Sequence, residues 1–446
     1  MSLDKSFYKN MLQIAIPIAL QNLITSSLNT MDTIMVSQLG AASIASVGLS
    51  NQLFFIFMFL TFGINTGSSV FMAQYWGRKD VKSLRHILGL ALCFSILLAI
   101  LFSLLAILAP NMVLSMMIKN PEVIQIGAKY LRVVGFTYLI TAISFTLETA
   151  LRTCGDPKTP LIASFISFGT QLFFNYVFIF GEFGFPRLGV VGAAVGTIIA
   201  RLAEFIYMFY TIKTNDVPFN TPIRNLLNFD RAFLKHYLKF TWPVLLNEAF
   251  WSVGQVLYNV AYAIVGTNAI AAVQVSFAIQ QIVFVIVRGL GSSCTIILGQ
   301  TIGEGSLDRV KIYARRYLKL ALGTGLLIGS FLIFTPHITL VIFGDLSSVV
   351  YGLAVKILKV LGVAFIVKTI NSIIIIGILR GGGDTLFAMI LESFCVWGVG
   401  VPLAFIGAIF LDLPIYWVVA LASTEEIFKI LVGLKRIASE KWIHIL

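Results

Sequence analysis

Short polar segments divide the chain into apolar stretches, each long enough to cross a lipid bilayer as a helix. Of the 446 residues, 58% are hydrophobic and only 12% are charged, and the mean hydropathy is +0.93. Soluble domains carry about a quarter charged residues, because their surfaces face water. The pattern therefore predicts an all-α polytopic membrane protein and excludes an ordinary soluble domain. The short N-terminal segment lacks a small-residue cleavage site after its apolar run, which favours an uncleaved first span.

Stretches of about 20 apolar residues predict twelve transmembrane helices. They cover residues 11–36, 46–73, 87–109, 125–151, 159–181, 190–212, 238–264, 271–299, 316–335, 350–379, 386–410 and 413–434. The longest connector, between Lys213 and Lys239, divides the chain almost in half. We therefore expect an N-terminal six-helix lobe over 1–225 and a C-terminal six-helix lobe over 226–446.

Basic residues are concentrated on one side of the predicted membrane. They lie in alternate connectors: Arg78, Lys79, Lys82, Arg85, Arg152, Lys158, Lys213, Arg224, Arg309, Lys311, Arg315, Arg380, Lys435 and Arg436. The connectors on the opposite side hold almost none. Since cytoplasmic loops are enriched in Lys and Arg, both termini are predicted to be cytoplasmic, in the inner membrane of a cell. This distribution also accounts for the formal net charge of +12 without a nucleic-acid partner.

The two halves are related in sequence. FYKNMLQIAIP (7–17) aligns without a gap to FLKHYLKFTWP (233–243), at an offset of 226 residues. At the same offset Gln74 falls on Gln300, and Gly77 falls on Gly303. Because each half has an even number of predicted spans, we expect parallel repeats related by an axis along the membrane normal. Such a duplication favours a transporter, although a channel or a structural membrane protein could be duplicated too.

Cysteine and histidine residues predict no metal centre or disulfide framework. The four Cys and four His residues are scattered, without a CxxC pair or a mixed cluster. The chain also lacks the GxxxxGK[ST] phosphate-binding motif and the catalytic motifs HExxH and GxSxG. We therefore expect no cofactor and no enzymatic activity. The glycine-rich segment GTGLLIG (323–329) is expected to allow close helix packing.

Asp32 is the most informative charged residue within a predicted span. It lies late in the first span among apolar neighbours, with no basic residue within helical reach. Two interpretations are open from the residues alone: an acid at the outer interface, or a carboxylate that carries a proton or holds Na⁺. Pro17, in the same span, frees a backbone carbonyl and permits either a functional bend or an ordinary packed kink.

Other charges within spans have structural explanations as well as functional ones. Glu248 follows Pro243 in the seventh span, where a salt bridge to Lys368 or Arg288 is the structural alternative. Helical spacing predicts two neutralised pairs, Arg201 with Glu204 and Glu425 with Lys429. Glu148 and Glu392 have no evident partner nearby in the sequence.

Seven short motifs, in order along the chain, resemble the multidrug and toxic compound extrusion (MATE) family. They are MDTIMVSQLG (31–40), LRTCGDPKT (151–159), NYVFIFG (175–181), LGVVGAAVGT (188–197), WPVLLNEAFWSVG (242–254), LRGGGDT (379–385) and EEIFKILVGLKR (425–436). The resemblance implies a cation-coupled antiporter that expels organic cations and multiple drugs by alternating access between two lobes. The coupling ion would be H⁺ or Na⁺, and a monomer would suffice because one chain supplies both lobes.

The resemblance also implies which residues couple transport to the ion. Asp32 occupies the position of the family's cation-responsive aspartate, and Gln171, Asn175 and Thr197 fall on the positions that surround it. Some members have Asn in place of Gln171 and an acid in place of Asn175. Pro17 matches as well, and Glu248 lies about one turn before an acid that some members require.

The substrate cavity is predicted from residues near the expected cleft. Flat organic cations could stack on aromatic side chains through cation–π contacts. Candidate cavity residues are Met31, Met35, Gln52, Tyr258, Gln274 and Gln281. The main alternative is a flippase for lipid-linked oligosaccharides or cell-wall precursors. It would need several basic residues for a pyrophosphate, and only Arg201, Arg288 and Lys368 lie deep in predicted spans.

Overall fold

A computed structural model of the chain describes residues 2–215, 217–344 and 346–446, and within these ranges the protein is helical. The N-terminal helices are α1 Ser2–Ser37, α2 Ala41–Gly77, α3 Val81–Leu108, α4 Pro110–Ser115, α5 Pro121–Val134, α6 Thr137–Thr153, α7 Lys158–Phe180, α8 Val190–Thr214 and α9 Ile223–Leu226. The C-terminal helices are α10 Arg231–Val265, α11 Thr267–Gly303, α12 Leu307–Phe334, α13 Pro336–Leu340, α14 Ser348–Ser372, α15 Thr385–Cys395, α16 Val401–Phe405, α17 Ile415–Ser423 and α18 Glu425–Ala438. A short 3₁₀ helix η1 (Val341–Phe343) and the π-helical segments η2 (Ile373–Arg380), η3 (Val396–Gly400) and η4 (Ile406–Phe410) complete the chain.

Nine helices in the described part of the chain are long and apolar enough to cross a membrane, and a tenth span results if the pair α5 and α6, bent by 49°, is counted as one. The protein is therefore a multi-pass membrane protein. The nine are Ser6–Ser37, Ala41–Gly77, Val81–Leu108, Lys158–Phe180, Val190–Thr214, Thr267–Gly303, Leu307–Phe334, Ser348–Arg380 and Thr385–Phe410.

Two of the twelve predicted spans fall on helices that do not meet these criteria. The predicted span 238–264 lies in α10, which begins with Arg231, Lys235 and Lys239. The predicted span 413–434 lies over the short helices α17 and α18, and α18 begins with two glutamates. Charged residues lower the mean hydropathy of α10, and α17 and α18, with 9 and 14 residues, are each too short to cross a membrane alone, so the count of twelve stays a prediction.

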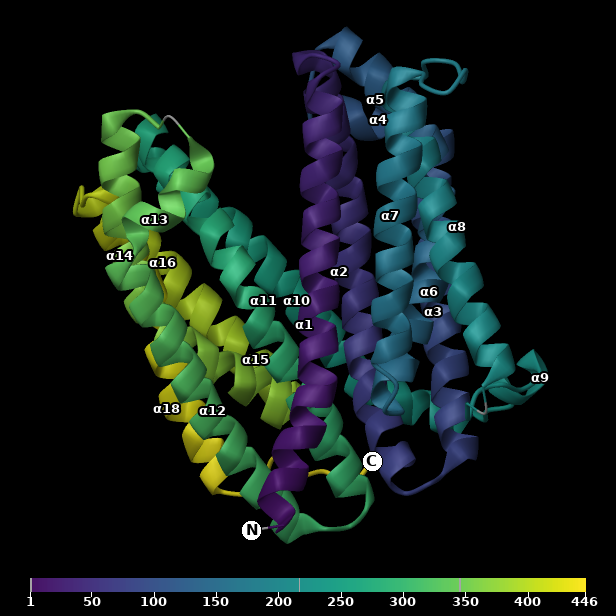
Figure 1. Ribbon diagram of the computed structural model, residues 1–446. Helices are drawn as coiled ribbons and strands as arrows, with labels where there is room; N and C mark the ends of the chain where they lie inside the picture. The colour runs from purple at the N-terminus through teal and green to yellow at the C-terminus, as the bar shows by residue number, and fades with distance from the viewer. Residues whose placement is uncertain (1, 216, 345) are drawn as a thin grey trace. The chain divides into compact units, whose positions relative to one another are not determined.

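The helices pack into two compact units, which we call the N-unit (Leu20–Met72 and Lys79–Leu238) and the C-unit (Met1–Ala19, Ala73–Arg78 and Lys239–Leu446). In the N-unit, α7 and α8 lie side by side, drawn in teal (Figure 1). They approach closely because α8 presents Gly192 and Gly196 to α7, and a Cβ on Gly192 would lie only 2.4 Å from the carbonyl oxygen of Phe178. Phe57 stacks on Tyr138 in the buried core of this unit, with 5.1 Å between ring centroids.

In the C-unit, α12 packs along α14, both drawn in green (Figure 1). The glycine-rich segment predicted to allow close packing does so at two of its positions. A Cβ on Gly325 would lie 3.0 Å from the carbonyl oxygen of Ile366, and one on Gly329 would lie 2.5 Å from that of Gly362. Gly323, in contrast, has no heavy atom of another residue within 4 Å of its Cβ position.

The C-terminal segment after α18 folds back onto the LRGGGDT loop of the C-unit. Trp442 is fully buried against Gly382, and Gly383 pairs with Ile443 in an isolated antiparallel bridge. The backbone N–H of His444 donates to the carbonyl of Gly382 over 2.7 Å. This contact fixes the loop that follows Arg380 and so helps to position that side chain.

Candidate ion-coupling site and buried charge networks

Asp32 forms a polar cluster with the other three residues expected around it in the N-unit. Gln171 Nε2 donates to Asp32 Oδ2 over 2.6 Å, and Asn175 Nδ2 donates to Asp32 Oδ1 over 2.6 Å. Gln171 Nε2 also lies 3.4 Å from Thr197 Oγ1, and that hydroxyl donates to the carbonyl of Ala193. Both carboxylate oxygens therefore receive an amide donor, which stabilises the ionised form.

Helical geometry explains how the cluster forms. Gln171 and Asn175 are four residues apart on α7 and so lie on one face of that helix. Both side chains are buried, and Gly196 of α8 lies directly against Asn175. The amide oxygens Gln171 Oε1 and Asn175 Oδ1 have no hydrogen-bond partner within the described part of the chain. These two unpaired oxygens lie beside the carboxylate of Asp32. Oxygen ligands of these kinds are the ones that hard cations prefer.

Protonation and Na⁺ binding are both chemically compatible with this cluster. Among the described residues no three His, Cys, Asp or Glu side chains gather as a metal site. A Na⁺ ion here would therefore rely on the single carboxylate of Asp32 together with neutral oxygens from Gln171, Asn175 and Thr197. Pro17 lies in the same helix, buried, in the part of α1 that belongs to the C-unit, and the helix continues across it.

A second network in the N-unit involves Glu148. Its Oε2 accepts from Gln21 Nε2 over 2.7 Å and from Arg152 Nη2 over 2.8 Å, and Arg152 also donates to Gln21 Oε1. The expectation that Glu148 lacks a nearby partner is wrong, because Arg152 lies one helical turn further along α6. The predicted pair of Arg201 and Glu204 is confirmed, with 2.7 Å between Nη1 and Oε2.

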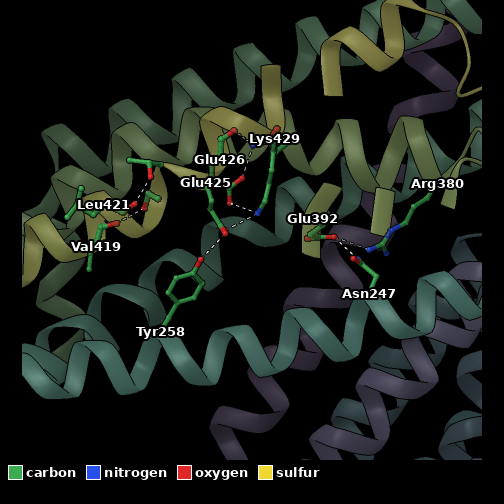
Figure 2. A network of polar contacts seen from close by, with 12 residues as sticks. Asn247, Tyr258, Arg380, Glu392, Val419, Leu421, Glu425, Glu426 and Lys429 are labelled. Atoms are coloured by element: carbon green, nitrogen blue, oxygen red, sulfur yellow. Dashed lines mark hydrogen bonds and ion pairs between the residues drawn. The ribbon is translucent and has the colours of Figure 1, made fainter. Parts of the chain in front are cut away.

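In the C-unit, Glu248 forms an ion pair with a residue that the sequence places in a loop. Arg380 Nη1 lies 2.7 Å from Glu248 Oε1, and Arg380 Nη2 lies 3.3 Å from Glu392 Oε2. Asn247 Nδ2 donates to the same Glu392 oxygen over 2.6 Å. The predicted partners Lys368 and Arg288 are therefore wrong. Arg380 is only 2% exposed and neutralises both acids. Figure 2 shows its contact with Glu392, beside Asn247.

Figure 2 also shows a fourth network, in which Lys429 binds two neighbouring glutamates of α18. Lys429 Nζ lies 2.9 Å from Glu425 Oε1, as predicted, and 3.7 Å from Glu426 Oε1. Tyr258, predicted to line the cavity, is buried and donates its hydroxyl to Glu425 Oε2 over 2.8 Å. Asn371 Nδ2 donates to Glu426 Oε2 over 2.8 Å.

The other predicted cavity residues are mostly accessible. Met31 and Gln52 of the N-unit are exposed, and Met35 is half-buried. In the C-unit, Gln274 is exposed and donates to Asn259 Oδ1 over 3.0 Å. Gln281 is exposed as well and accepts from Arg288 over 3.3 Å. Exposure is consistent with a lining role, which stays a prediction for these residues.

Comparison with known proteins identifies the family. The MatE family model matches residues 17–177 and 243–406, which together make up well over half of the chain. The chain belongs to the MatE family. It is thus a MATE transporter, as its motifs predict, and the two matched segments begin at residues 17 and 243, 226 residues apart, which is the offset of the internal repeat.

Relatives and solved structures agree with this assignment. The chain is 28% identical over 408 residues to the probable multidrug resistance protein YoeA of Bacillus subtilis, covering 90% of this chain and 87% of that protein. It is 24% identical to the probable multidrug resistance protein NorM of Thermotoga maritima, covering 97% and 93%. An outward-facing structure of a multidrug resistance MATE family transporter superposes with a TM-score of 0.88 at 22% identity, covering 97% and 96%.

Proposed function

We propose that this MATE protein is a cation-coupled antiporter that exports organic cations and multiple drugs by alternating access. The observation that carries the proposal is the cluster around Asp32, where two amide donors at 2.6 Å hold a carboxylate within a membrane-spanning helix. A charged group within a bilayer is energetically costly, so its presence in a span indicates a function. Reversible binding of H⁺ or Na⁺ is such a function. Relatives named for multidrug resistance support the substrate class.

The proposed architecture has two lobes, residues 1–225 and 226–446, with twelve spans and both termini in the cytoplasm. Lobes related by an axis along the membrane normal can rock against each other and open alternately to either side. One chain would supply both lobes, so a monomer in the inner membrane would be sufficient. The partners would be small molecules and the lipid bilayer, with no nucleic acid and no enzymatic step.

A flippase for lipid-linked precursors is the second candidate. It is favoured by one observation. Arg288 and Lys368 lie deep in predicted spans, and neither has a carboxylate of the described chain within ion-pair distance. Arg201, the third deep basic residue, is neutralised by Glu204.

The test uses purified protein in liposomes loaded with a fluorescent organic cation. Efflux is followed under an imposed H⁺ gradient and, separately, under an imposed Na⁺ gradient, for the wild type and for Asp32→Asn. Asp308→Asn, which changes an exposed acid in the first turn of α12, is the matched control. We expect one gradient to drive efflux in the wild type and the control, and the Asp32→Asn protein to lose that coupling. Folded wild type that moves the dye under neither gradient would exclude drug antiport and direct attention to lipid-linked substrates.

A further inference from the structure

Two cationic side chains of the C-unit contact one aromatic ring. The guanidinium carbon of Arg288 lies 5.7 Å from the ring centroid of Phe284, and Lys368 Nζ lies 5.5 Å from it. Arg288 and Phe284 are four residues apart on α11, and Lys368 comes from α14. Phe365, one turn before Lys368, packs edge-on against Phe284 with 6.0 Å between the centroids. Two positive charges and two aromatic rings thus meet at one place in the fold.

The acids nearby are already engaged by other cations. Arg380 binds Glu248 and Glu392, and Lys429 binds Glu425 and Glu426. These four pairs leave Arg288 and Lys368 without a carboxylate at ion-pair distance among the residues described. Among those residues, Arg288 donates a side-chain hydrogen bond only to the neutral amide oxygen of Gln281, over 3.3 Å. The two cations repel each other because both lie close to the same ring, while Glu426 and Glu425 attract Lys368 from beyond ion-pair distance.

The face of α11 that carries Arg288 presents a polar side chain at every seventh residue. Thr267, Gln274, Gln281 and Arg288 follow one another at intervals of seven residues and are all exposed. Residues seven apart lie on the same face of an α-helix, so these four form a polar stripe along the span. A guanidinium midway along such a span would be costly in lipid hydrocarbon. The stripe therefore faces water or a ligand.

We propose that Arg288, Lys368 and Phe284 form a binding site for an anionic group, a carboxylate or phosphate, on an amphipathic molecule with a flat apolar body. An oxyanion between the two cations would replace their repulsion by two charge-assisted contacts. The partly exposed ring of Phe284 offers an apolar surface for the rest of the ligand, and the fully buried ring of Phe365 supports it edge-on from behind. The site adds an anionic substrate class to the proposed export of organic cations, and it rests on that function only for its physiological meaning.

The test measures binding rather than transport, so its failure is distinguishable from failure of the antiport proposal. Purified protein in phosphatidylcholine nanodiscs is dialysed to equilibrium against 1-naphthoate or 1-naphthylmethylammonium, two probes of like shape and opposite charge. Binding to empty nanodiscs is subtracted. We expect the wild type to bind naphthoate at least about tenfold more tightly than the cation, since charge-assisted contacts are worth about that factor each.

Variants locate the binding. Arg288→Gln and Lys368→Gln should each weaken naphthoate binding about tenfold, whereas the charge-keeping variants Arg288→Lys and Lys368→Arg should retain most of it. Lys356→Gln is the matched control, because Lys356 also lies on α14 and over an aromatic ring, that of Tyr416 at 5.2 Å. Equal affinity for both probes, or naphthoate binding that Lys368→Gln leaves unchanged in folded protein, would overturn the proposal.

A second arm separates a soluble ligand from a lipid. The assay is repeated in nanodiscs that contain phosphatidylglycerol, an anionic lipid. If a lipid phosphate occupies the site, wild-type affinity for naphthoate falls in these discs, and the Lys368→Gln protein shows a smaller decrease. If the site takes soluble anions only, the affinity for naphthoate changes by the same factor in the wild type and in Lys368→Gln between the two kinds of disc.

Discussion

Gly196 of α8 lies directly against the side-chain amide of Asn175 on α7, so that a Cβ at position 196 would be only 2.1 Å from Asn175 Oδ1. No side chain larger than hydrogen fits there without moving the amide. The same amide donates through Nδ2 to Asp32 over 2.6 Å. The absence of a side chain at position 196 therefore sets the hydrogen bonding of a carboxylate on a third element, α1.

Gly196→Ala is expected to displace Asn175 and weaken ion coupling. Because this hydrogen bond stabilises ionised Asp32, its loss, worth about 1.5–3 kcal/mol, should shift the ion concentration that gives half-maximal efflux roughly tenfold or more. The measurement is gradient-driven efflux in liposomes as a function of ion concentration. Gly169→Ala on α7 is the control, because its Cβ would have no neighbour within 4 Å.

Both substitutions replace a helical glycine with alanine, so both gain helix propensity and only the displaced amide differs. An unchanged dependence on the coupling ion in Gly196→Ala, with the fold intact, would show that Asn175 does not tune Asp32.

Removing Arg380 is expected to destabilise the C-unit strongly. Arg380→Met would leave the carboxylates of Glu248 and Glu392 without their shared cation, and breaking a buried ion pair costs about 3–5 kcal/mol. Thermal unfolding of the purified protein in detergent measures the loss. The control Arg309→Met removes the exposed pair with Glu304 and should cost about 1 kcal/mol or less.

Neutralising one acid as well should restore part of the stability. The double variant Arg380→Met and Glu248→Gln is expected to melt at a higher temperature than Arg380→Met alone, because fewer buried charges stay uncompensated. If the single variant melts like the wild type, the network contributes little to stability and must serve another purpose.

Ion pairs within one helix could be predicted from the sequence, while those between helices could not. Arg201 with Glu204, and Glu425 with Lys429, follow from helical spacing. The same rule would have found Glu148 with Arg152, had Arg152 not been placed in a loop. Glu248 and Arg380 are 132 residues apart, and their contact depends on how α10 packs against the end of η2. Periodicity and charge within one segment contain no information on that packing.

The internal repeat is another feature that the sequence predicts only in part. The sequence predicts that Gln74 and Gly77 are equivalent to Gln300 and Gly303. It does not predict that the two copies touch. In the C-unit a Cβ on Gly77 would lie 2.1 Å from the carbonyl oxygen of Gln300, and one on Gly303 would lie 2.0 Å from that of Gln74. The repeated glycines thus form a reciprocal contact between the end of α2 and the end of α11.

Alanine at either of these glycines should force the two helix ends apart. The opposing atoms are backbone carbonyls, which cannot rotate away as a side chain can, so Gly77→Ala and Gly303→Ala are each expected to cost about 1–3 kcal/mol. Thermal unfolding is the measurement. Gly323→Ala, where the added methyl would meet no heavy atom within 4 Å, should be neutral or slightly stabilising. Equal melting temperatures for all three variants would contradict the close contact.

The thiol of Cys154, just after the end of α6, is expected to be unreactive in the folded protein. Burial raises the pKa of the Cys154 thiol to about 12, whereas an unperturbed thiol has a pKa of about 8.5. Because the thiolate is the nucleophile, a raised pKa lowers the reactive fraction at neutral pH by about a thousandfold or more.

Maleimide labelling, followed by peptide mass spectrometry, should therefore be slow at pH 7.5 and accelerate about tenfold per pH unit up to the limit of native stability. A cysteine introduced at the exposed position of Ser439 provides the labelling rate of an accessible thiol. In denaturant, Cys154 should be labelled as fast as this reference cysteine. Rapid native labelling of Cys154 at pH 7.5 would mean that this end of α6 opens to water, and with it the adjacent pair of Arg152 and Glu148.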